Sequence, residues 1–469
     1  MRNSVLLFLG CLVFHIAGTW SLPLIDRDEP RFAEASREML QRHDYVIPYF
    51  NNQYRFDKPP LTYWCQAASF RVFGESDFAA RFPTALAAAL VSSLLFAWAT
   101  RLRGERAGWW AAIVFTLALQ TFLHGKAAVA DMWLVLFFTL AHWSAWELFN
   151  ANSYRQKWWW IFYISLALGF LAKGPVAWIP LATVGFARWS YKAEDFNARF
   201  RLFWGIPLTL AIVGAWGVPA LMRTNGDFFR VGIMHHVIGR SLAPMEGHGA
   251  SSPGMYFALL PFYFVTLFVS FFPWSTRLPA LWSDLRTNRD ATDRFLLTGT
   301  LLIFGIFTLV KTKLPHYTLP AFPLIALLLA RRFEVLRLSR SVAVWSASVY
   351  LLIALLATPF LAQFFPSYTL ARESSRDLTP KMEFGAVDYT EPSLVWYFRA
   401  RVRGFMTTLK RKDAVHYMNE SGPRFTVLPT ELVMEIFPNP DPSWRIYRSS
   451  GFNIPKGQRV DLTMLLKPE

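Results

Sequence analysis

Long apolar runs divide this sequence, and they constrain its fold more than any other feature. The first run covers residues 5–20, and ten more follow between residues 79 and 364, with polar connections between them. Apolar runs of about 20 residues can cross the hydrocarbon core of a bilayer as helices, because a helix satisfies its own backbone hydrogen bonds. The sequence therefore predicts an α-helical polytopic membrane protein with about eleven transmembrane helices.

The first run resembles a signal peptide, but a charged stretch follows it directly and no convincing small-residue cleavage site is present. We therefore expect it to remain as an uncleaved first span. The later expected spans are 79–100, 107–123, 128–148, 157–172, 174–188, 202–222, 255–273, 295–310, 316–330 and 342–364.

Charge along the chain predicts its orientation. The formal net charge is +16, and every second short connection is rich in Arg and Lys, which is typical of cytoplasmic loops and of contacts to anionic lipids. We therefore expect membrane lipids as partners and no nucleic acid. The remaining connections are expected on the opposite, non-cytoplasmic face of the membrane. They are 21–78, 124–131, 172–175, 222–254 and 311–316.

The chain is expected to form two domains. Residues 1–365 would form the transmembrane domain, with its first outer loop at 21–78, and residues 366–469 a small soluble α/β domain on the same non-cytoplasmic side as that loop. In the second part KMEFGAVDY and RVDLTMLL favour strands, PSLVWYFRA favours a helix, and RFTVLPTELV suits either. Only Cys11 and Cys65 occur, so neither a disulfide framework nor a thiolate metal site is expected.

The first outer loop carries an unusual density of charge between Asp26 and Leu40. Pro30 suits the start of a helix, and the apolar residues after it recur at helical spacing, which predicts an amphipathic helix on the membrane surface. Asp28 would lie at the positive end of that helix. The alternative is that Asp28 and Glu29 only cap the helix.

The same loop contains the sequence FDKPP. Its two prolines forbid a helix immediately before one that can start at Pro60, so Lys58 is expected at a turn beside the membrane surface. A lysine ammonium there is a natural partner for a lipid phosphate. The alternative is a lysine that reaches the interface without a ligand.

Two later connections place charge at the ends of apolar helices. Asp131 opens an apolar helix, and Lys173 lies in a tight reversal that Gly174 and Pro175 explain. Ionisable residues at such positions are candidates for a functional site. For Asp131 the alternative is a helix cap, and for Lys173 a marker of the membrane interface.

Two further clusters carry basic side chains. In MHHVIGR the neighbouring histidines would point different ways on a helix and match no zinc pattern, so no metal ligands are expected there, whereas Arg240 suits a phosphate. In KTKLPHYTLPAFP, the residues His316 and Tyr317 come just before a proline-interrupted span, together with Lys311 and Lys313. Broken helices leave backbone groups that need partners such as a ligand.

Taken in order, DEPRFAEASREM, FDKPPLTYW, ADMW, LAKGP and KLPHYTLP resemble the polytopic transferases that use polyprenyl-phosphate sugars. The likeness is greatest to the lipid A 4-amino-4-deoxy-L-arabinose transferases, within the mannosyltransferase-like superfamily with the GT-C fold. It implies Asp28 and Asp131 as catalytic acids, and Lys58, Arg240 and Tyr317 as ligands of the carrier phosphate.

The resemblance also implies contacts to the substrates from neighbouring residues, with no cofactor firmly implied and a divalent metal left open. The residues expected there are Glu29, Arg55, Asp57, Lys173 and His316. Arg55 stands where the aminoarabinose transferases often have an aromatic residue.

The implied reaction is inverting transfer of a sugar, such as an amino-pentose, from a polyprenyl phosphate to lipid A or another envelope acceptor. Asp28 would orient an acceptor that is already anionic, or act as general base on a hydroxyl. A protein or glycan O-glycosyltransferase of the same superfamily is the main alternative. A lipid transporter fits less well, because the polar clusters fall on one face and the two halves do not repeat.

Overall fold

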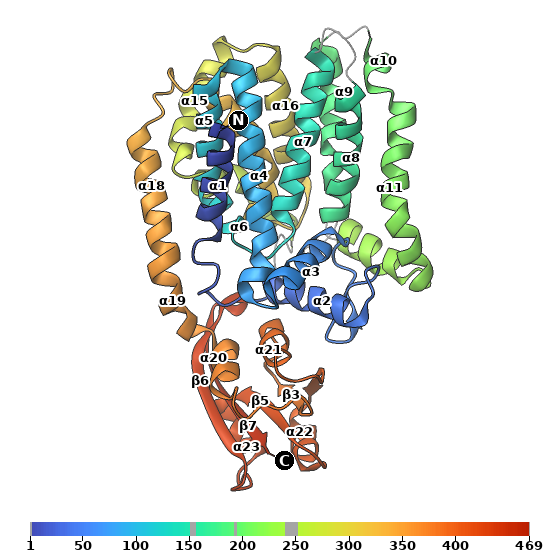
Figure 1. The fold of residues 1–469 in the computed structure, drawn as a ribbon, viewed down its shortest axis with the longest axis vertical. Helices are drawn as coiled ribbons and strands as arrows, with labels where there is room; N and C mark the ends of the chain where they lie inside the picture. Colours follow the sequence, from blue (N-terminus) through green and yellow to red (C-terminus); the bar gives the residue numbers. More distant parts are fainter. Residues whose placement is uncertain (1, 151–155, 192–194, 240–251, 469) are drawn as a thin grey trace. The chain divides into compact units, whose positions relative to one another are not determined.

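The computed structural model describes residues 2–150, 156–191, 195–239 and 252–468. The chain forms two compact units (Figure 1), here called unit 1 and unit 2. Unit 1 comprises Met1–Ile16, Phe56–Thr62 and Thr84–Tyr350, and unit 2 comprises Ala17–Arg55, Tyr63–Pro83 and Leu351–Glu469. The expected domain boundary after residue 365 stays a prediction. The two units group most of the first outer loop with the C-terminal segment.

The regular secondary structure of unit 1, in its described residues, is helical. Its helices are α1 (Arg2–Ile16), most of α4 (Asp77–Arg103), α5 (Glu105–Thr116), α6 (Leu119–His124), α7 (Asp131–Asn150), α8 (Gln156–Lys173), α9 (Ile179–Tyr191), α10 (Phe196–Phe200), α11 (Leu202–Arg223), α13 (Pro253–Ala258), α14 (Phe262–Ser270), α15 (Leu278–Thr287), α16 (Ala291–Leu309), α17 (Phe322–Ala330) and nearly all of α18 (Arg340–Leu352). The tighter or wider turns η1 (Pro175–Trp178), η2 (Phe228–Gly239), η3 (Trp274–Arg277) and η4 (Pro315–Ala321) join or extend them.

The expected apolar runs are all at least partly helical, but the expected count of eleven spans is not confirmed. Among the described residues, five helical stretches are long and apolar enough to cross a membrane. They are Asp77–Arg103, Asp131–Asn150, Phe196–Arg223, Ala291–Leu309 and Arg340–Phe364. Prolines and changes of helix type shorten other runs, because a proline inside a helix removes a hydrogen bond and clashes with the preceding turn.

Small residues bring helices of unit 1 close together. Leu7 and Cys11 of α1 pack with Ala89 and Ala112 of α4 and α5. At Gly108 of α5 an added Cβ would lie 2.2 Å from a hydroxyl oxygen of α4, which leaves no room for a side chain. Close backbone approach of this kind is the usual way that helices associate in a membrane, where lipid removes much of the hydrophobic driving force.

Unit 2 is built on a five-stranded sheet with the order β4-β3-β5-β7-β6. The strand β3 pairs in parallel with β4 and β5, whereas β7 pairs antiparallel with β5 and β6. Its strands are β3 (Glu383–Val387), β4 (Met406–Leu409), β5 (Arg424–Pro429), β6 (Arg445–Asn453) and β7 (Gln458–Lys467). The predicted strands at β3 and β7 are confirmed, and the ambiguous segment RFTVLPTELV begins as the strand β5.

Helices cover both faces of this sheet. One core joins Leu394 and Phe398 to Phe384 and Phe425 of the sheet, and a second joins Tyr417 and other side chains to the opposite face. The helices of unit 2 are α2 (Asp28–Arg42), most of α3 (Leu61–Phe73), α19 (Thr358–Leu361), α20 (Pro366–Glu373), α21 (Pro392–Phe398), α22 (Arg411–Asn419) and α23 (Val433–Ile436). The shorter turns η5 (Ile353–Ala357), η6 (Ala362–Phe364), η7 (Thr430–Leu432) and η8 (Ile454–Lys456) and the hairpin of β1 (Tyr49–Phe50) and β2 (Gln53–Tyr54) complete it.

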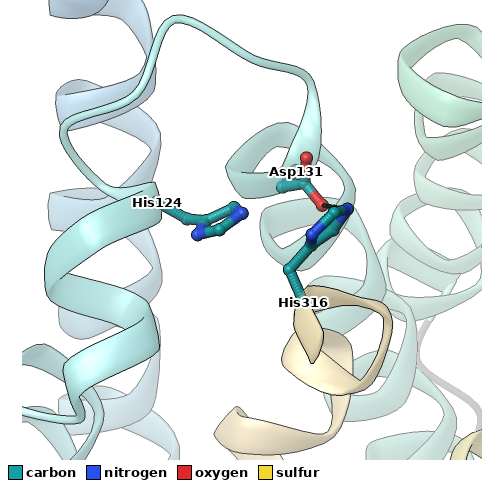
Figure 2. Close-up of side chains that lie close together, drawn as sticks. All are labelled: His124, Asp131 and His316. Atoms are coloured by element: carbon teal, nitrogen blue, oxygen red, sulfur yellow. Dashed lines mark ion pairs between the residues drawn. The ribbon is translucent and has the colours of Figure 1, made fainter. Parts of the chain in front are cut away.

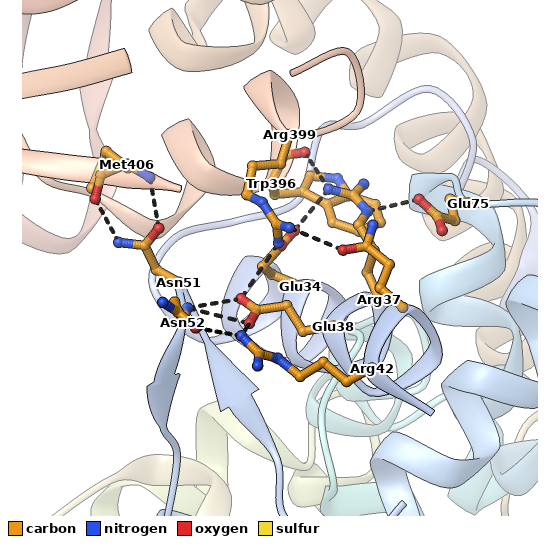
Figure 3. A network of polar contacts seen from close by, with 11 residues as sticks. Glu34, Arg37, Glu38, Arg42, Asn51, Asn52, Glu75, Trp396, Arg399 and Met406 are labelled. Carbon is orange, nitrogen blue, oxygen red and sulfur yellow. Dashed lines mark hydrogen bonds and ion pairs between the residues drawn. The ribbon is translucent and has the colours of Figure 1, made fainter. Parts of the chain in front are cut away.

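The helix α2 forms as predicted, but its polar face is covered by protein. Arg37 is 1% exposed, donates to Glu34 and to the backbone oxygen of Trp396, and stacks on that indole at 3.8 Å (Figure 3). Arg399 pairs with Glu34 and lies 3.4 Å from Glu38. Since these partners come from α21 and the residue after it, the polar face of α2 forms an ion-pair network inside unit 2. The predicted position of α2 on a membrane surface stays a prediction.

Candidate active site

A cluster of polar side chains lies where three segments of unit 1 meet (Figure 2). Asp131 begins α7, as predicted, and is 7% exposed. Lys173 is the last residue of α8, and its Nζ lies 2.5 Å from Oδ1 of Asp131. His316 of η4 places its Nε2 4.0 Å from the same oxygen. An acid at a helix N-terminus and a lysine at a helix C-terminus both complement the helix dipoles, which favours this ion pair.

Tyr317 and His124 extend the cluster. The Lys173 ammonium lies 5.7 Å from the centre of the Tyr317 ring, and the imidazoles of His124 and His316 lie 4.9 Å apart. Four residues that the sequence predicts separately are thus brought together: Asp131, Lys173, His316 and Tyr317. His124 was not predicted, although it closes the short helix α6 just before the connection to α7.

Lys58 lies in the same unit, at the turn that the two prolines predict. The helix α3 begins at Leu61, directly after them, and the Lys58 ammonium donates to the backbone oxygen of Asp57 at 3.1 Å. Lys58 is close enough to His316 for its charge to act on that imidazole. Asp57 and Lys58 are both half-buried. The predicted phosphate ligand Arg240 and the histidine pair of MHHVIGR lie outside what the structure describes in side-chain detail.

Three side chains of this cluster have the chemistry of a metal site. One ligand atom from each of His124, Asp131 and His316 lies within 4.8 Å of the others, a donor set of two imidazoles and a carboxylate that suits a zinc-like cation. The Lys173 ammonium already lies against the carboxylate of Asp131. A divalent cation bound to that same oxygen, Oδ1, would have to displace the ammonium.

The other predicted residues, Asp28, Glu29 and Arg55, belong to unit 2. Asp28 is the first residue of α2 and is exposed. Across the described part of the chain, its carboxylate has neither a hydrogen bond nor an ion pair. The alternative that it merely caps the helix therefore has no bond to support it, and a free carboxylate stands at the positive end of α2.

Glu29 and Arg55 are buried and engaged in contacts within unit 2. The Glu29 carboxylate receives two hydrogen bonds from the guanidinium of Arg81, at 2.9 and 2.7 Å, and a third from the backbone N–H of Ile25. Arg55 donates to the hydroxyl of Tyr63 at 3.0 Å. These contacts favour a structural role for Glu29 as the partner of Arg81, and not as a cap of the helix. A role in substrate binding stays a prediction for both residues.

Asp26, two residues before Asp28, provides a pH test of how α2 is held. Its carboxylate accepts hydrogen bonds from the backbone N–H and the hydroxyl of Ser393, at 2.9 and 2.5 Å. Burial raises the pKa of Asp26 from 3.8 to about 7, Glu391 acts in the same direction, and the Ser393 bonds act against it. The pKa of Asp26 is higher in the folded protein than in the unfolded chain, so protonation of Asp26 stabilises the fold. This contribution is fully present below about pH 4, and it is lost as the pH rises through about 7.

We therefore expect the melting temperature of the purified protein to fall between pH 5 and pH 8, and Asp26→Asn to remove much of this fall, because the amide does not ionise. Thermal unfolding of both proteins across that range measures it. Equal pH dependence in the two proteins would contradict the assignment.

Comparisons with known proteins agree with this architecture. Residues 57–217 match the family described as dolichyl-phosphate-mannose-protein mannosyltransferase. An undecaprenyl phosphate-alpha-4-amino-4-deoxy-L-arabinose arabinosyl transferase of Edwardsiella ictaluri is 30% identical over 309 residues, which cover 65% of this chain and 54% of that protein. The match thus spans about half the length of that relative. An uncharacterized protein of Aquifex aeolicus is 29% identical over 70% of this chain and 72% of its own.

A solved structure shares the whole fold. The crystal structure of ArnT from Cupriavidus metallidurans bound to undecaprenyl phosphate superposes with a TM-score of 0.81. The match covers 99% of this chain and 98% of that one, at 18% sequence identity. The two chains therefore have the same fold, including the helical unit and the sheet-containing unit.

Proposed function

We propose that this chain, which is similar to arabinosyl transferases that use undecaprenyl phosphate, transfers a sugar from a polyprenyl phosphate to an acceptor of the cell envelope. The reaction takes place at the periplasmic face of a bacterial inner membrane. The sugar is an amino-pentose or a similar residue, and the acceptor is lipid A or a related glycolipid. Inversion follows from direct attack of the acceptor on the anomeric carbon.

The observation that carries this proposal is the convergence of Asp131, Lys173, His316 and Tyr317 at the ends of apolar helices, with Lys58 in the same unit. A departing phosphate gains negative charge as the bond to the sugar breaks, and fixed cations and hydroxyl donors stabilise that charge. Lys58, Tyr317 and Arg240 supply those contacts. Asp131 holds the Lys173 ammonium in place, so that its charge also faces the site.

Asp28 acts on the acceptor. With a lipid A phosphate, which is already anionic, the carboxylate orients the acceptor or the sugar. With a hydroxyl it accepts the proton as the new bond forms. Its exposure and its freedom from other contacts suit either role.

Protein or glycan O-glycosylation is the second candidate, favoured by the match of residues 57–217 to the protein mannosyltransferase family. The two candidates differ in their product. Mass spectrometry of lipid A and of envelope proteins, from cells with and without this chain, distinguishes them. A sugar added to lipid A supports the main proposal, and one added only to proteins contradicts it.

Replacing Lys58 by alanine tests the proposed phosphate contact. We expect the KM for the polyprenyl-phosphate sugar to rise about tenfold or more, because a charge-assisted hydrogen bond to phosphate contributes roughly 1.5–3 kcal/mol. The measurement is initial rate against donor concentration with purified protein. Lys412→Ala, an exposed lysine of α22, is the matched control and should leave that KM unchanged. An unchanged KM in Lys58→Ala would remove Lys58 from the donor site.

A further inference from the structure

Four arginines gather at one cleft of unit 2, with a volume of about 630 Å³. They are Arg42 at the end of α2, and Arg399, Arg401 and Arg403 in the segment that follows α21. The cleft lies entirely within unit 2 and contains none of the residues assigned above to the transfer reaction. A volume in this range is typical of sites that bind small molecules or headgroups.

Two of these arginines, Arg42 and Arg399, are paired with carboxylates of α2 (Figure 3). Arg399 pairs with Glu34 and donates to the side-chain oxygen of Gln41 at 2.9 Å. Arg42 pairs with Glu38 at 3.3 Å. Both guanidinium groups lie over the ring of Phe405, at 4.2 and 5.7 Å from its centre. These contacts hold the ring of Phe405 at the cleft, which the side-chain amides of Gln41 and Asn52 also line.

The other two arginines of the cleft differ from these in their exposure and in their lack of partners. Arg401 and Arg403 are exposed, and neither has an ion pair or a side-chain hydrogen bond among the residues that the structure describes. Val402 between them is 1% exposed, and the backbone N–H groups of Arg401 and Arg403 are bonded to Phe398 and Pro380. The backbone is therefore anchored, and two positive charges without counter-charges stand at the cleft.

We propose that this cleft binds the phosphate-bearing saccharide headgroup of a glycolipid. Arg401 and Arg403 hold the phosphate, since guanidinium groups match phosphate geometry and two of them balance its charge. Phe405 packs against a sugar ring, and Gln41 and Asn52 hydrogen-bond its hydroxyls. The inference rests on the proposed function, because it names the acceptor class, a phosphorylated glycolipid held by unit 2.

Binding is tested with the full-length protein in detergent and three probes: a glucosamine disaccharide bisphosphate without acyl chains, the same disaccharide without phosphate, and inorganic phosphate. The site variant is the double substitution Arg401→Glu and Arg403→Glu. The matched control is Arg448→Glu with Arg459→Glu, two exposed arginines of β6 and β7 that do not line the cleft and change the net charge equally. Equal melting temperatures establish that both variants fold.

We expect the bisphosphate to bind more tightly than either other probe. The site variant should weaken its binding by about tenfold or more, the cost of losing charge-assisted bonds to phosphate, and the control should leave it unchanged. Equal loss in both variants, or equally tight binding of the disaccharide without phosphate, would overturn the proposal. Inorganic phosphate bound as tightly as the bisphosphate would overturn the saccharide part and leave a plain anion site.

Transfer assays separate this inference from the proposed function. In the site variant the KM for a phosphorylated acceptor should rise while the KM for the donor stays constant. If the wild-type protein transfers no sugar but binds the bisphosphate through Arg401 and Arg403, the proposed function is wrong and the assignment of the cleft as a binding site is supported. If transfer proceeds and the site variant binds the bisphosphate as tightly as the wild type does, the assignment of the cleft as a binding site is wrong and the proposed function is supported.

Discussion

Replacing Asp28 by asparagine is expected to lower the rate of sugar transfer by a factor of about 10² to 10⁴, the usual contribution of a positioned acid or base. The carboxylate is exposed at the first residue of α2 and has no partner among the described residues, so its loss should cost the fold little. Asparagine keeps the size of the side chain and also suits a helix start. Only the charge and the ability to accept a proton are removed.

Asp413→Asn is the matched control for this change. Asp413 is likewise an exposed aspartate in the first turn of a helix of unit 2, but in α22. Both variants should be inserted and should melt like the wild type, and only Asp28→Asn should lose transfer activity. Full activity of Asp28→Asn, with the expected product, would remove Asp28 from the mechanism.

Replacing Arg81 by methionine is expected to destabilise unit 2 by roughly 3–5 kcal/mol, the cost of removing one partner from a buried ion pair. Arg81 is 2% exposed, and it makes two bonds to Glu29. It also donates to three backbone oxygens in the segment between α1 and α2, those of Thr19, Leu22 and Pro23. Methionine leaves a buried carboxylate and three carbonyl groups without their donor.

Thermal unfolding and the yield of folded protein measure this effect. Arg376→Met makes the same side-chain change at an exposed position of unit 2 and should melt like the wild type. Adding Glu29→Leu to Arg81→Met should recover part of the loss, because no unpaired carboxylate then remains. A wild-type melting temperature in Arg81→Met alone would show that the pair does not hold the entry to α2.

The sequence predicts α2 but not its surroundings. The recurrence of Phe32, Ala35 and Met39 along one face is enough to indicate a helix, and all three are buried. The partners of its polar face cannot be seen in that pattern, because Trp396 lies 359 residues after Arg37. An exposed polar face on a membrane surface and a polar face paired with a distant helix have the same local sequence.

The candidate site shows the same limit. Asp131, Lys173 and His316 stand out individually, because ionisable residues at the ends of apolar runs are costly unless they have a purpose or a partner. Which of them pair depends on how the helices pack, and only the structure gives the ion pair of Asp131 with Lys173. His124 is also an ionisable residue at the end of an apolar run, since it ends the short helix α6. The same criterion would therefore have identified it from the sequence.

In the sheet of unit 2 the strands β3 and β7 were predicted, the segment of β5 was left open between helix and strand, and the edge strands β4 and β6 were missed. The segments at β3, β5 and β7 are apolar and lie inside the sheet order, where both faces can be covered. The two edge strands, β4 and β6, carry exposed residues between buried ones, and their sequences give a weaker strand signal. Sheet order follows from long-range pairing, which local patterns do not encode.

We propose above all that this chain takes its sugar from a polyprenyl phosphate. The most direct measurement incubates the purified protein with lipid A and undecaprenyl-phosphate aminoarabinose, and in parallel with the same sugar on a nucleotide, and follows the mass of lipid A. We expect lipid A to gain one sugar residue for each undecaprenyl phosphate released, and to gain none from the nucleotide sugar. A gain of the sugar from the nucleotide donor, or no gain from undecaprenyl-phosphate aminoarabinose, would contradict this proposal.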